Sequence, residues 1–336
     1  MTADARWAEQ SKLSTTSPLY AYLAARISED GEIASIIDVA PPAQRLGVLL
    51  LAAVHYLLLR GDGHELARHY ESLGGGDAGD PYPAFRDFCL RRRTNLEHLC
   101  ATRSVQTNEV RRSAYLMPAI AAIGTRVHLL EAGASAGLNL VFDRYRYDYG
   151  GHGATGDAAS PVRIATEVRG GFAAPAMPSI DHRRGLDLNP LDATDPDTLL
   201  WLRACIWPEH HERRALLEAA AAVAATDPPA VTRGSATTDL ADVARTLPDG
   251  PLCVLHSVVL PYVDEPGRAA FRTQLDAIAS ERDLYVVSGE GAKAINDVFG
   301  TSFEHGDGFC VTLTHDGETR LLGRAGFHGE WIEWPA

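Results

Sequence analysis

The chain has 336 residues, with 31 Lys and Arg against 44 Asp and Glu, a formal net charge of −13 at pH 7. A negative balance of this size repels a phosphate backbone and argues against a nucleic-acid partner. Hydrophobic residues make up 46% and charged residues 22% of the chain. These values exclude a disordered chain, and the length predicts two domains.

The N-terminal residues show neither the basic nor the apolar region of a signal peptide, and the apolar run 48–59 is too short to cross a bilayer. Five cysteines form no Cys-x-x-Cys pair, and no His-Glu-x-x-His motif is present. We therefore expect a cytoplasmic protein with a small-molecule substrate, without a membrane partner or a metal. The sequence does not determine the oligomeric state.

Residues 1–122 have helical periodicity throughout. Ser17-Pro18 predicts the start of a first helix, and further helices are expected over about 41–60, 83–100 and 107–123. No strand pattern interrupts them. We predict an all-helical N-terminal domain over residues 1–122.

The pattern changes in residues 123–336. An apolar strand at 127–130 is followed by a turn of small residues and a helix from 138, and further strands are expected at 185–188, 230–234, 252–257 and 284–288. Helices at 211–225 and 266–280 alternate with them, which predicts a Rossmann-like α/β domain with a mostly parallel sheet. Asp316-Gly317 between two strand-like runs predicts an antiparallel C-terminal hairpin.

The turn after the first strand allows three interpretations. Gly133, Ser135 and Gly137 let a backbone approach a ligand closely, as in the first loop of an S-adenosylmethionine enzyme. Gly133-x-Ser135-x-Gly137 also fits a nucleophile elbow with Ser135 as the attacking residue. Its triad would be completed by Asp187 or Asp264 and by His305 or His328. A tight turn without a ligand has a prior of roughly one in three.

Polar residues at later strand ends favour the adenosyl hypothesis. Asp187 can accept both hydroxyls of a ribose. Ser235 and Asp239 would flank the adenine, and His256 and Ser257 would face the reacting group. Each also has a structural alternative, with Asp187 as a turn cap and His256 as a core histidine.

Several stretches together carry a family resemblance: 103–109, 131–140, 143–150, 184–192, 206–208 and 256–257. The chain resembles the DUF2332 family of uncharacterised bacterial proteins, which look like class I methyltransferases in fold. The resemblance implies a fold and an approximate site, without a substrate.

The sequence departs from the usual methyltransferase pattern between Glu131 and Asp187. The acidic residue usually follows the glycine loop by roughly 20 residues, so an insertion is expected at about 141–180. Residues 145–149 and 162–168 are predicted to pair in it as a hairpin. If that hairpin held the ribose, Asp148 or Glu167 would replace Asp187.

The first hypothesis is an S-adenosylmethionine-dependent methyltransferase acting on a small polar metabolite. Alternatives are an esterase or thioesterase using Ser135, and an inactive nucleoside-binding scaffold. The predicted cofactor residues are Glu131, Gly133, Ser135, Gly137, Asn139, Asp187, Asn189, Ser235 and Asp239. The residues predicted to position or deprotonate the acceptor are Tyr145, His256 and Glu109. The predicted substrate residues are Gln106, Asn108, Arg112, Tyr147 and Ser257, for the first three of which a solvated helix surface is the structural alternative.

Overall fold

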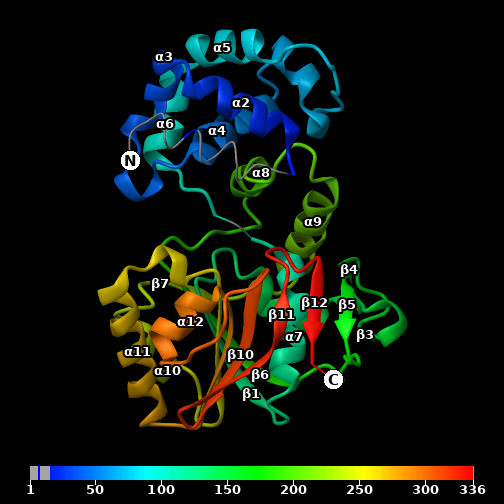
Figure 1. Ribbon diagram of the computed structural model, residues 1–336, viewed down its shortest axis with the longest axis vertical. Helices are drawn as coiled ribbons and strands as arrows, with labels where there is room; N and C mark the ends of the chain where they lie inside the picture. The colour runs from blue at the N-terminus through cyan, green and yellow to red at the C-terminus, as the bar shows by residue number, and fades with distance from the viewer. Residues whose placement is uncertain (1–6, 8–15, 107, 336) are drawn as a thin grey trace. The chain divides into compact units, whose positions relative to one another are not determined.

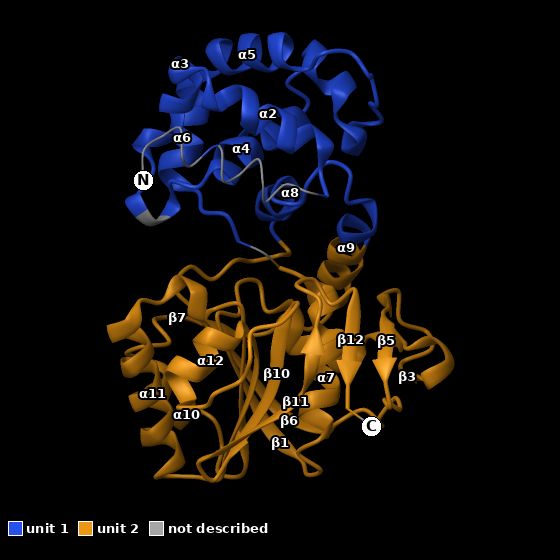
Figure 2. Ribbon diagram, in the orientation of Figure 1, with its two compact units in different colours: residues 1–107, 195–215 blue, residues 108–194, 216–336 orange. Residues whose placement is uncertain are grey.

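The computed structural model describes residue 7 and residues 16–106 and 108–335. The chain forms two compact units, shown in different colours in Figure 2. Unit 1 comprises residues 1–107 and 195–215, and unit 2 comprises residues 108–194 and 216–336. This division differs from the predicted boundary at 122/123, because residues 108–122 belong to unit 2, which holds the sheet.

The described residues of unit 1 form helices and connecting segments without a strand. The first helix begins as predicted, because Ser17 Oγ accepts the N–H of Tyr20 and Pro18 is the first helical residue. The α-helices that lie wholly in unit 1 are α2 (Pro18–Ser28), α3 (Gly31–Ala34), α4 (Gly47–Leu59), α5 (Tyr82–Arg91), α6 (Arg93–Thr102) and α8 (Pro196–Ala204).

Helix α4 lies in the core of unit 1, where its Leu50 and Leu57 share a buried apolar cluster with Trp201 of α8. Nδ1 of His55 is 3.1 Å from the carbonyl oxygen of Ala204. Burial lowers the pKa of His55 to about 4, so its ring is neutral at pH 7. These contacts explain why α8, distant in sequence, belongs to unit 1. In the described ranges, neither α4 nor any other helix has the length and hydropathy of a membrane span.

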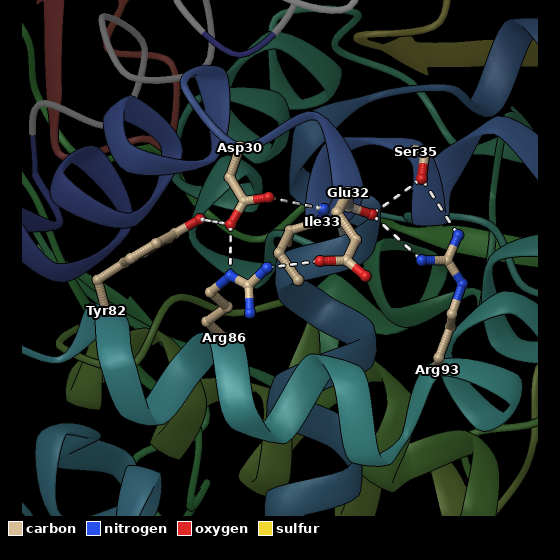
Figure 3. A network of polar contacts seen from close by, with 7 residues as sticks. All are labelled: Asp30, Glu32, Ile33, Ser35, Tyr82, Arg86 and Arg93. Carbon is tan, nitrogen blue, oxygen red and sulfur yellow. Dashed lines mark hydrogen bonds and ion pairs between the residues drawn. The ribbon is translucent and has the colours of Figure 1, made fainter.

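A polar network joins α3 to α5 (Figure 3). The carboxylate of Asp30 accepts the N–H of Ile33 at 3.3 Å, the hydroxyl of Tyr82 at 3.0 Å and Nε of Arg86 at 2.8 Å. Burial alone would raise the pKa of Asp30, but the hydrogen bonds from Arg86 and Tyr82 outweigh burial and lower it. The ionised carboxylate therefore fixes the start of α3 to α5.

Unit 2 is built on a large mixed sheet. In the described part of the chain, nine strands follow the order β5-β12-β11-β10-β9-β8-β1-β6-β7. The neighbours β7, β6, β1, β8 and β9 are parallel, so their carboxyl ends meet at one edge. They are β1 (Val127–Ala132), β6 (Ile180–Asp187), β7 (Val231–Arg233), β8 (Leu252–Ser257) and β9 (Leu284–Glu290).

The sheet continues beyond β9 with β10 antiparallel to β9, β11 antiparallel to β10, β12 antiparallel to β11, and β5 parallel to β12. Asp316 and Gly317 have φ of 49° and 77°, the left-handed backbone that a two-residue hairpin turn requires. The predicted C-terminal hairpin is thus confirmed. The strands are β10 (Phe309–His315), β11 (Glu318–Ala325), β12 (Trp331–Trp334) and β5 (Glu167–Gly170).

Helices cover both faces of the sheet (Figure 1). α10 (Leu240–Arg245), α11 (Glu265–Ala279) and α12 (Ala292–Phe299) share a buried apolar cluster with the parallel strands. On the other face lies α7 (Ser113–Ala121), whose Tyr115 occupies the space where a side chain at Gly289 of β9 would be. α9 (His211–Ala225) contributes residues to both units.

The insertion between β1 and β6 differs from its prediction. β2 (Arg146–Asp148) pairs antiparallel with β3 (Ala154–Gly156) and parallel with β4 (Arg163–Ala165) in a separate three-stranded sheet. The predicted hairpin between 145–149 and 162–168 is therefore wrong in its partner, because residues 154–156 return first and 163–165 then run parallel to β2.

The segment after the first strand is also not the predicted α-helix. Residues 138–144 form a 3-10 helix that is interrupted at Val141, with φ −107° and ψ 23°. Side chains take carbonyl groups that an α-helix would use, since Tyr145 Oη donates to Leu138 and Arg183 Nη1 donates to Leu140. The turn after β1 therefore leads into a short, interrupted 3-10 helix in place of the predicted α-helix.

Candidate functional site

Polar side chains gather at the carboxyl edge of the parallel strands. Glu131 is the penultimate residue of β1, Asp187 is the last of β6, and Ser257 is the last of β8. Because β1 lies between β6 and β8, these residues occupy neighbouring positions on one edge. This edge is the candidate site, and residues 133–137, here named the glycine turn, follow its central strand.

The glycine turn contains three left-handed residues. Gly133, Ser135 and Gly137 have φ of 74°, 51° and 70°. For Ser135 such a backbone costs about 1–3 kcal/mol and persists only where surrounding contacts determine it. A Cβ atom at Gly133 would lie 2.4 Å from Cγ2 of Val259. Glycine at 133 is therefore required by a neighbouring side chain as well as by the backbone.

Backbone N–H groups of the turn already have protein acceptors. Those of Gly133 and Ala134 donate to the carbonyl oxygen of Leu186 at 2.8 and 3.2 Å. That of Ser135 donates to Oδ2 of Asp187 at 2.8 Å. In this conformation these N–H groups are not directed at an anionic ligand, so a bound molecule would be held mainly by side chains.

Asn108 braces the turn with both ends of its amide. Nδ2 donates to Oγ of Ser135 at 2.8 Å, and Oδ1 accepts the N–H of Ala136 at 3.1 Å. The predicted role of Asn108 was contact with the substrate. Its hydrogen bonds instead support the turn.

Asp187 closes the loop after β6 on the glycine turn. Its Oδ2 accepts from Ser135, and its Oδ1 accepts the N–H of Asn189 at 2.7 Å. The N–H of Leu191 in turn donates to the carbonyl oxygen of Ser135 at 3.1 Å. Asp187 thus has the capping role weighed from the sequence. A carboxylate oxygen can accept more than one hydrogen bond, so this capping role does not by itself exclude a ribose.

Glu131 is buried, and its Oε2 has no hydrogen-bond partner among the described residues. In the same described part of the chain, Oδ1 of Asn139 also lacks one. Burial raises the pKa of Glu131 to about 8, although the hydrogen bond from Asn139 opposes it, while Asp187 raises it further and Arg112 lowers it. Buried acceptors without donors suit a ligand that brings N–H groups.

The loops after β6 and β7 bring further predicted cofactor residues together. The N–H of Ser235 donates to Oδ2 of Asp239 at 2.7 Å. Nη2 of Arg233, the last residue of β7, is 3.4 Å from Oδ1 of Asn189. Asp187 and Asn189 therefore lie beside the loop that carries Ser235 and Asp239.

His256 lies in a buried polar cluster. Its Nε2 is 2.7 Å from Oγ of Ser288 and its Nδ1 is 3.0 Å from Oε1 of Glu290, and all three side chains have 0% exposure. Its ring meets Phe271 of α11 edge-on. The connectivity is that of a hydrolase relay, but a substrate does not reach a wholly buried serine. The core-histidine alternative fits this placement, and a base acting on an acceptor does not.

Tyr145 and Tyr147 are also buried. Their hydroxyls donate to the carbonyl oxygens of Leu138 at 2.6 Å and Phe142 at 2.8 Å. Burial raises the pKa of both phenols. Both side chains hold the insertion against residues 138–142, which does not fit their predicted contacts with acceptor and substrate.

Glu109 and Arg112 precede α7 and are buried. Oε2 of Glu109 is 3.5 Å from Nδ1 of His328, and Nε of Arg112 donates to the carbonyl oxygen of Phe327 at 3.2 Å. Both side chains thus join this segment to the loop between β11 and β12.

Ser257 is half-buried at the end of β8, and its Oγ is 2.9 Å from the hydroxyl of Tyr115. It lies at the candidate edge, and its predicted contact with a substrate stays a prediction. Gln106 belongs to unit 1 and is not among the residues that unit 2 brings together. Residue 107, in the same sequence stretch, lies outside the described residues.

The alternative ribose residues are placed elsewhere. Glu167 begins β5, which β12, β11, β10, β9 and β8 separate from β1, so this alternative is wrong. Asp148 belongs to the three-stranded sheet, and its Oδ1 accepts the N–H of Gly150 at 2.9 Å. Asp187 is the acidic residue that contacts the glycine turn.

Ser135 is not part of an assembled triad. Across the described residues its hydroxyl has no histidine partner and is bonded by Asn108. Of the predicted partners, Asp264 caps α11 by accepting the N–H of Gly267, and His328 lies beside Glu109. The arrangement gives no base to activate Ser135.

Sequence reasoning did not single out Val259, Ser288 or Glu290. A signal was present, because Ser288 and Glu290 are polar residues at alternate positions of an otherwise apolar strand, which places both on one face. Among the described residues, no three His, Cys, Asp or Glu side chains are placed to bind a metal ion.

Comparison with known proteins gives one family. The model of a family described as "Uncharacterized protein conserved in bacteria (DUF2332)" matches residues 4–334. No curated protein and no solved structure is similar enough to the chain to match. The match extends over both units, and the family description states no reaction.

Proposed function

Because the chain belongs to the DUF2332 family, whose description gives no activity, we propose from the site itself that it is an S-adenosylmethionine-dependent methyltransferase acting on a small polar metabolite. The cofactor site is the carboxyl edge of β1, β6 and β7 in unit 2. The observation that carries the proposal is the buried carboxyl group of Glu131 with an unpartnered oxygen beside Asn139.

An ammonium group fits these two side chains. It brings three N–H donors and a positive charge, whereas Glu131 Oε2 and Asn139 Oδ1 are acceptors without a donor among the described residues. A bound cation lowers the pKa of a neighbouring carboxyl group, so Glu131 ionises when the ammonium group binds. A charge-assisted hydrogen bond to the carboxylate is worth about twice a neutral one. The methionine portion of the cofactor carries such an ammonium group.

The strand order supports the same position. The parallel strands run β7-β6-β1-β8-β9, so the chain moves outward from β1 in one direction and then in the other. In open α/β sheets, ligands bind outside the carboxyl ends of the strands where this reversal occurs. Glu131 and the glycine turn stand at that point.

The remaining cofactor groups have side chains to meet them. We assign the ribose hydroxyls to the carboxylate of Asp187 and the adenine edge to Ser235 and Asp239. When bound, the cofactor supplies an activated methyl group. The protein would hold the acceptor in line with this methyl group. His256 and Tyr145 are not proposed as bases, because His256 contacts Glu290 and Tyr145 donates to the carbonyl oxygen of Leu138.

Isothermal titration with S-adenosylmethionine and S-adenosylhomocysteine tests the proposal. We expect the wild type to bind both, and Glu131→Gln to lose affinity about tenfold or more because one charged hydrogen bond becomes neutral. Asp181→Asn is the control, since Asp181 lies at the amino end of β6 and pairs with Arg126. It should bind as the wild type does.

Absence of binding by the wild type would end the proposal. Binding without methyl transfer to a broad panel of small polar acceptors would favour the nucleoside-binding scaffold instead. Equal affinity of Glu131→Gln and wild type would remove Glu131 from the site.

A further inference from the structure

The turn after β8, residues 258–260, has an unfavourable backbone. Val258 has φ 59°, and left-handed geometry is rare for a β-branched residue. Such a conformation persists when surrounding contacts hold it, and these residues tend to occur at functional sites. The residues of this β8 turn directly follow Ser257 at the candidate edge.

One carboxylate holds the β8 turn. Oε1 of Glu290 accepts the N–H of Val259 at 2.8 Å and that of Leu260 at 3.3 Å. Glu290 is the last residue of β9 and has 0% exposure. Its Oε2 has no hydrogen-bond partner among the described residues, so one oxygen atom accepts both hydrogen bonds from the β8 turn.

The carboxylate is itself anchored from the neighbouring strand. Oε1 of Glu290 also contacts Nδ1 of His256 at 3.0 Å, and Nε2 of His256 is 2.7 Å from Oγ of Ser288. All three side chains are buried on one face of β8 and β9. Glu290 is therefore fixed independently of the turn that it holds.

The β8 turn contacts the glycine turn. Val259 presents Cγ2 to Gly133, where a Cβ atom would be only 2.4 Å away. Gly133 itself is exposed at the candidate edge. Val259 thus lies against the glycine turn next to β1. Its N–H group is held by Glu290, while Nη2 of Arg268 donates to the carbonyl oxygen of Leu260 at 3.1 Å.

We propose that Glu290 is a positioning residue of the candidate site: from β9 it holds the β8 turn, and through Val259 it sets the space above the glycine turn. The effect on ligand affinity rests on the proposed adenosyl function, whereas the hold on the turn does not. Glu290 does not touch the ligand, so its contribution passes through the Val259 and Leu260 amides.

Amide hydrogen exchange of the full chain measures how Glu290 holds the β8 turn, separately from its effect on ligand affinity. Glu290→Met keeps the side-chain length and removes both acceptor oxygens, and Glu290→Gln keeps one oxygen. We expect the Val259 and Leu260 amides to exchange about tenfold or more faster in Glu290→Met, with Glu290→Gln closer to the wild type. Thr312→Val is the matched control, since Thr312 is buried on β10 opposite Ser288 and its Oγ1 has no hydrogen-bond partner among the described residues.

Titration with S-adenosylhomocysteine is the second arm. Affinity should fall in Glu290→Met, be largely restored in Glu290→Gln and be unchanged in Thr312→Val. If the wild type binds no adenosyl ligand, the proposed function fails. The hydrogen-exchange measurement still tests whether Glu290 holds the β8 turn. Equal exchange of the two amides in Glu290→Met and Thr312→Val would overturn the proposal.

Discussion

Glu131 links the folded state to pH through one buried proton. Burial raises its pKa from 4.5 to about 8. Between these values the folded protein keeps a proton on Glu131 that the unfolded chain has released, so stability falls as the pH rises. This contribution is complete below about pH 4.5 and is lost as the pH rises through about 8.

Glu131→Gln should remove this pH dependence, because glutamine stays neutral in both states. Free energies of unfolding from urea denaturation at about pH 5.5 and about pH 9 are the measurement. Each pKa unit corresponds to about 1.4 kcal/mol, so the wild type should lose up to several kcal/mol relative to the variant. Parallel stability profiles would show that Glu131 is not protonated by burial.

At the scale of elements, two turns at the ends of adjacent strands fit against each other. The glycine turn follows β1 and the β8 turn follows β8, and each contains a non-glycine residue with positive φ, Ser135 and Val258. Asn108 and Asp187 hold the first turn, and Glu290 holds the second. The contact of Val259 with Gly133 between the turns is therefore supported by buried or half-buried polar side chains.

Gly133→Ala tests the contact between the turns. The variant should be destabilised both by its positive φ and by the clash with Val259, and Val259→Ala should relieve the clash alone. We expect a coupling of about 1–3 kcal/mol in a double-mutant cycle measured by denaturation. Gly317→Ala is the control, because Gly317 has φ 77° with open space around it. If Gly133→Ala costs no more than Gly317→Ala, Val259 does not press on the glycine turn.

At the scale of the whole molecule, apolar runs predicted β1, β8 and β9, and Asp316-Gly317 predicted the final hairpin. Residues 180–184 of β6 lie outside the strand predicted at 185–188, because this part of the strand is mostly polar. The sequence also placed Asp187, Ser235 and Ser257 at the carboxyl ends of strands, and Asp187 and Ser257 are the last residues of β6 and β8. It did not predict the faces of the sheet. His256 and Ser257 are adjacent in sequence yet contact α11 and α7 on opposite sides.

Contacts between distant segments were beyond sequence reasoning. Residues 195–215 return to unit 1 because Trp201 and Ala204 fill its core, a packing that no local pattern reports. Likewise, the sequence predicts Tyr145 and Tyr147 as site residues, but their hydroxyls donate to backbone carbonyl oxygens. Glu290 was overlooked because its partners lie in the preceding strand and the turn after it.

A crystal structure of the full chain with S-adenosylhomocysteine tests the adenosyl site most directly. The ligand should lie in unit 2 at the carboxyl edge of β1, β6 and β7, with its ammonium group hydrogen-bonded to Glu131 and Asn139 and its ribose at Asp187. A ligand bound elsewhere, or crystals that remain free of it at saturating concentration, would contradict the proposed function.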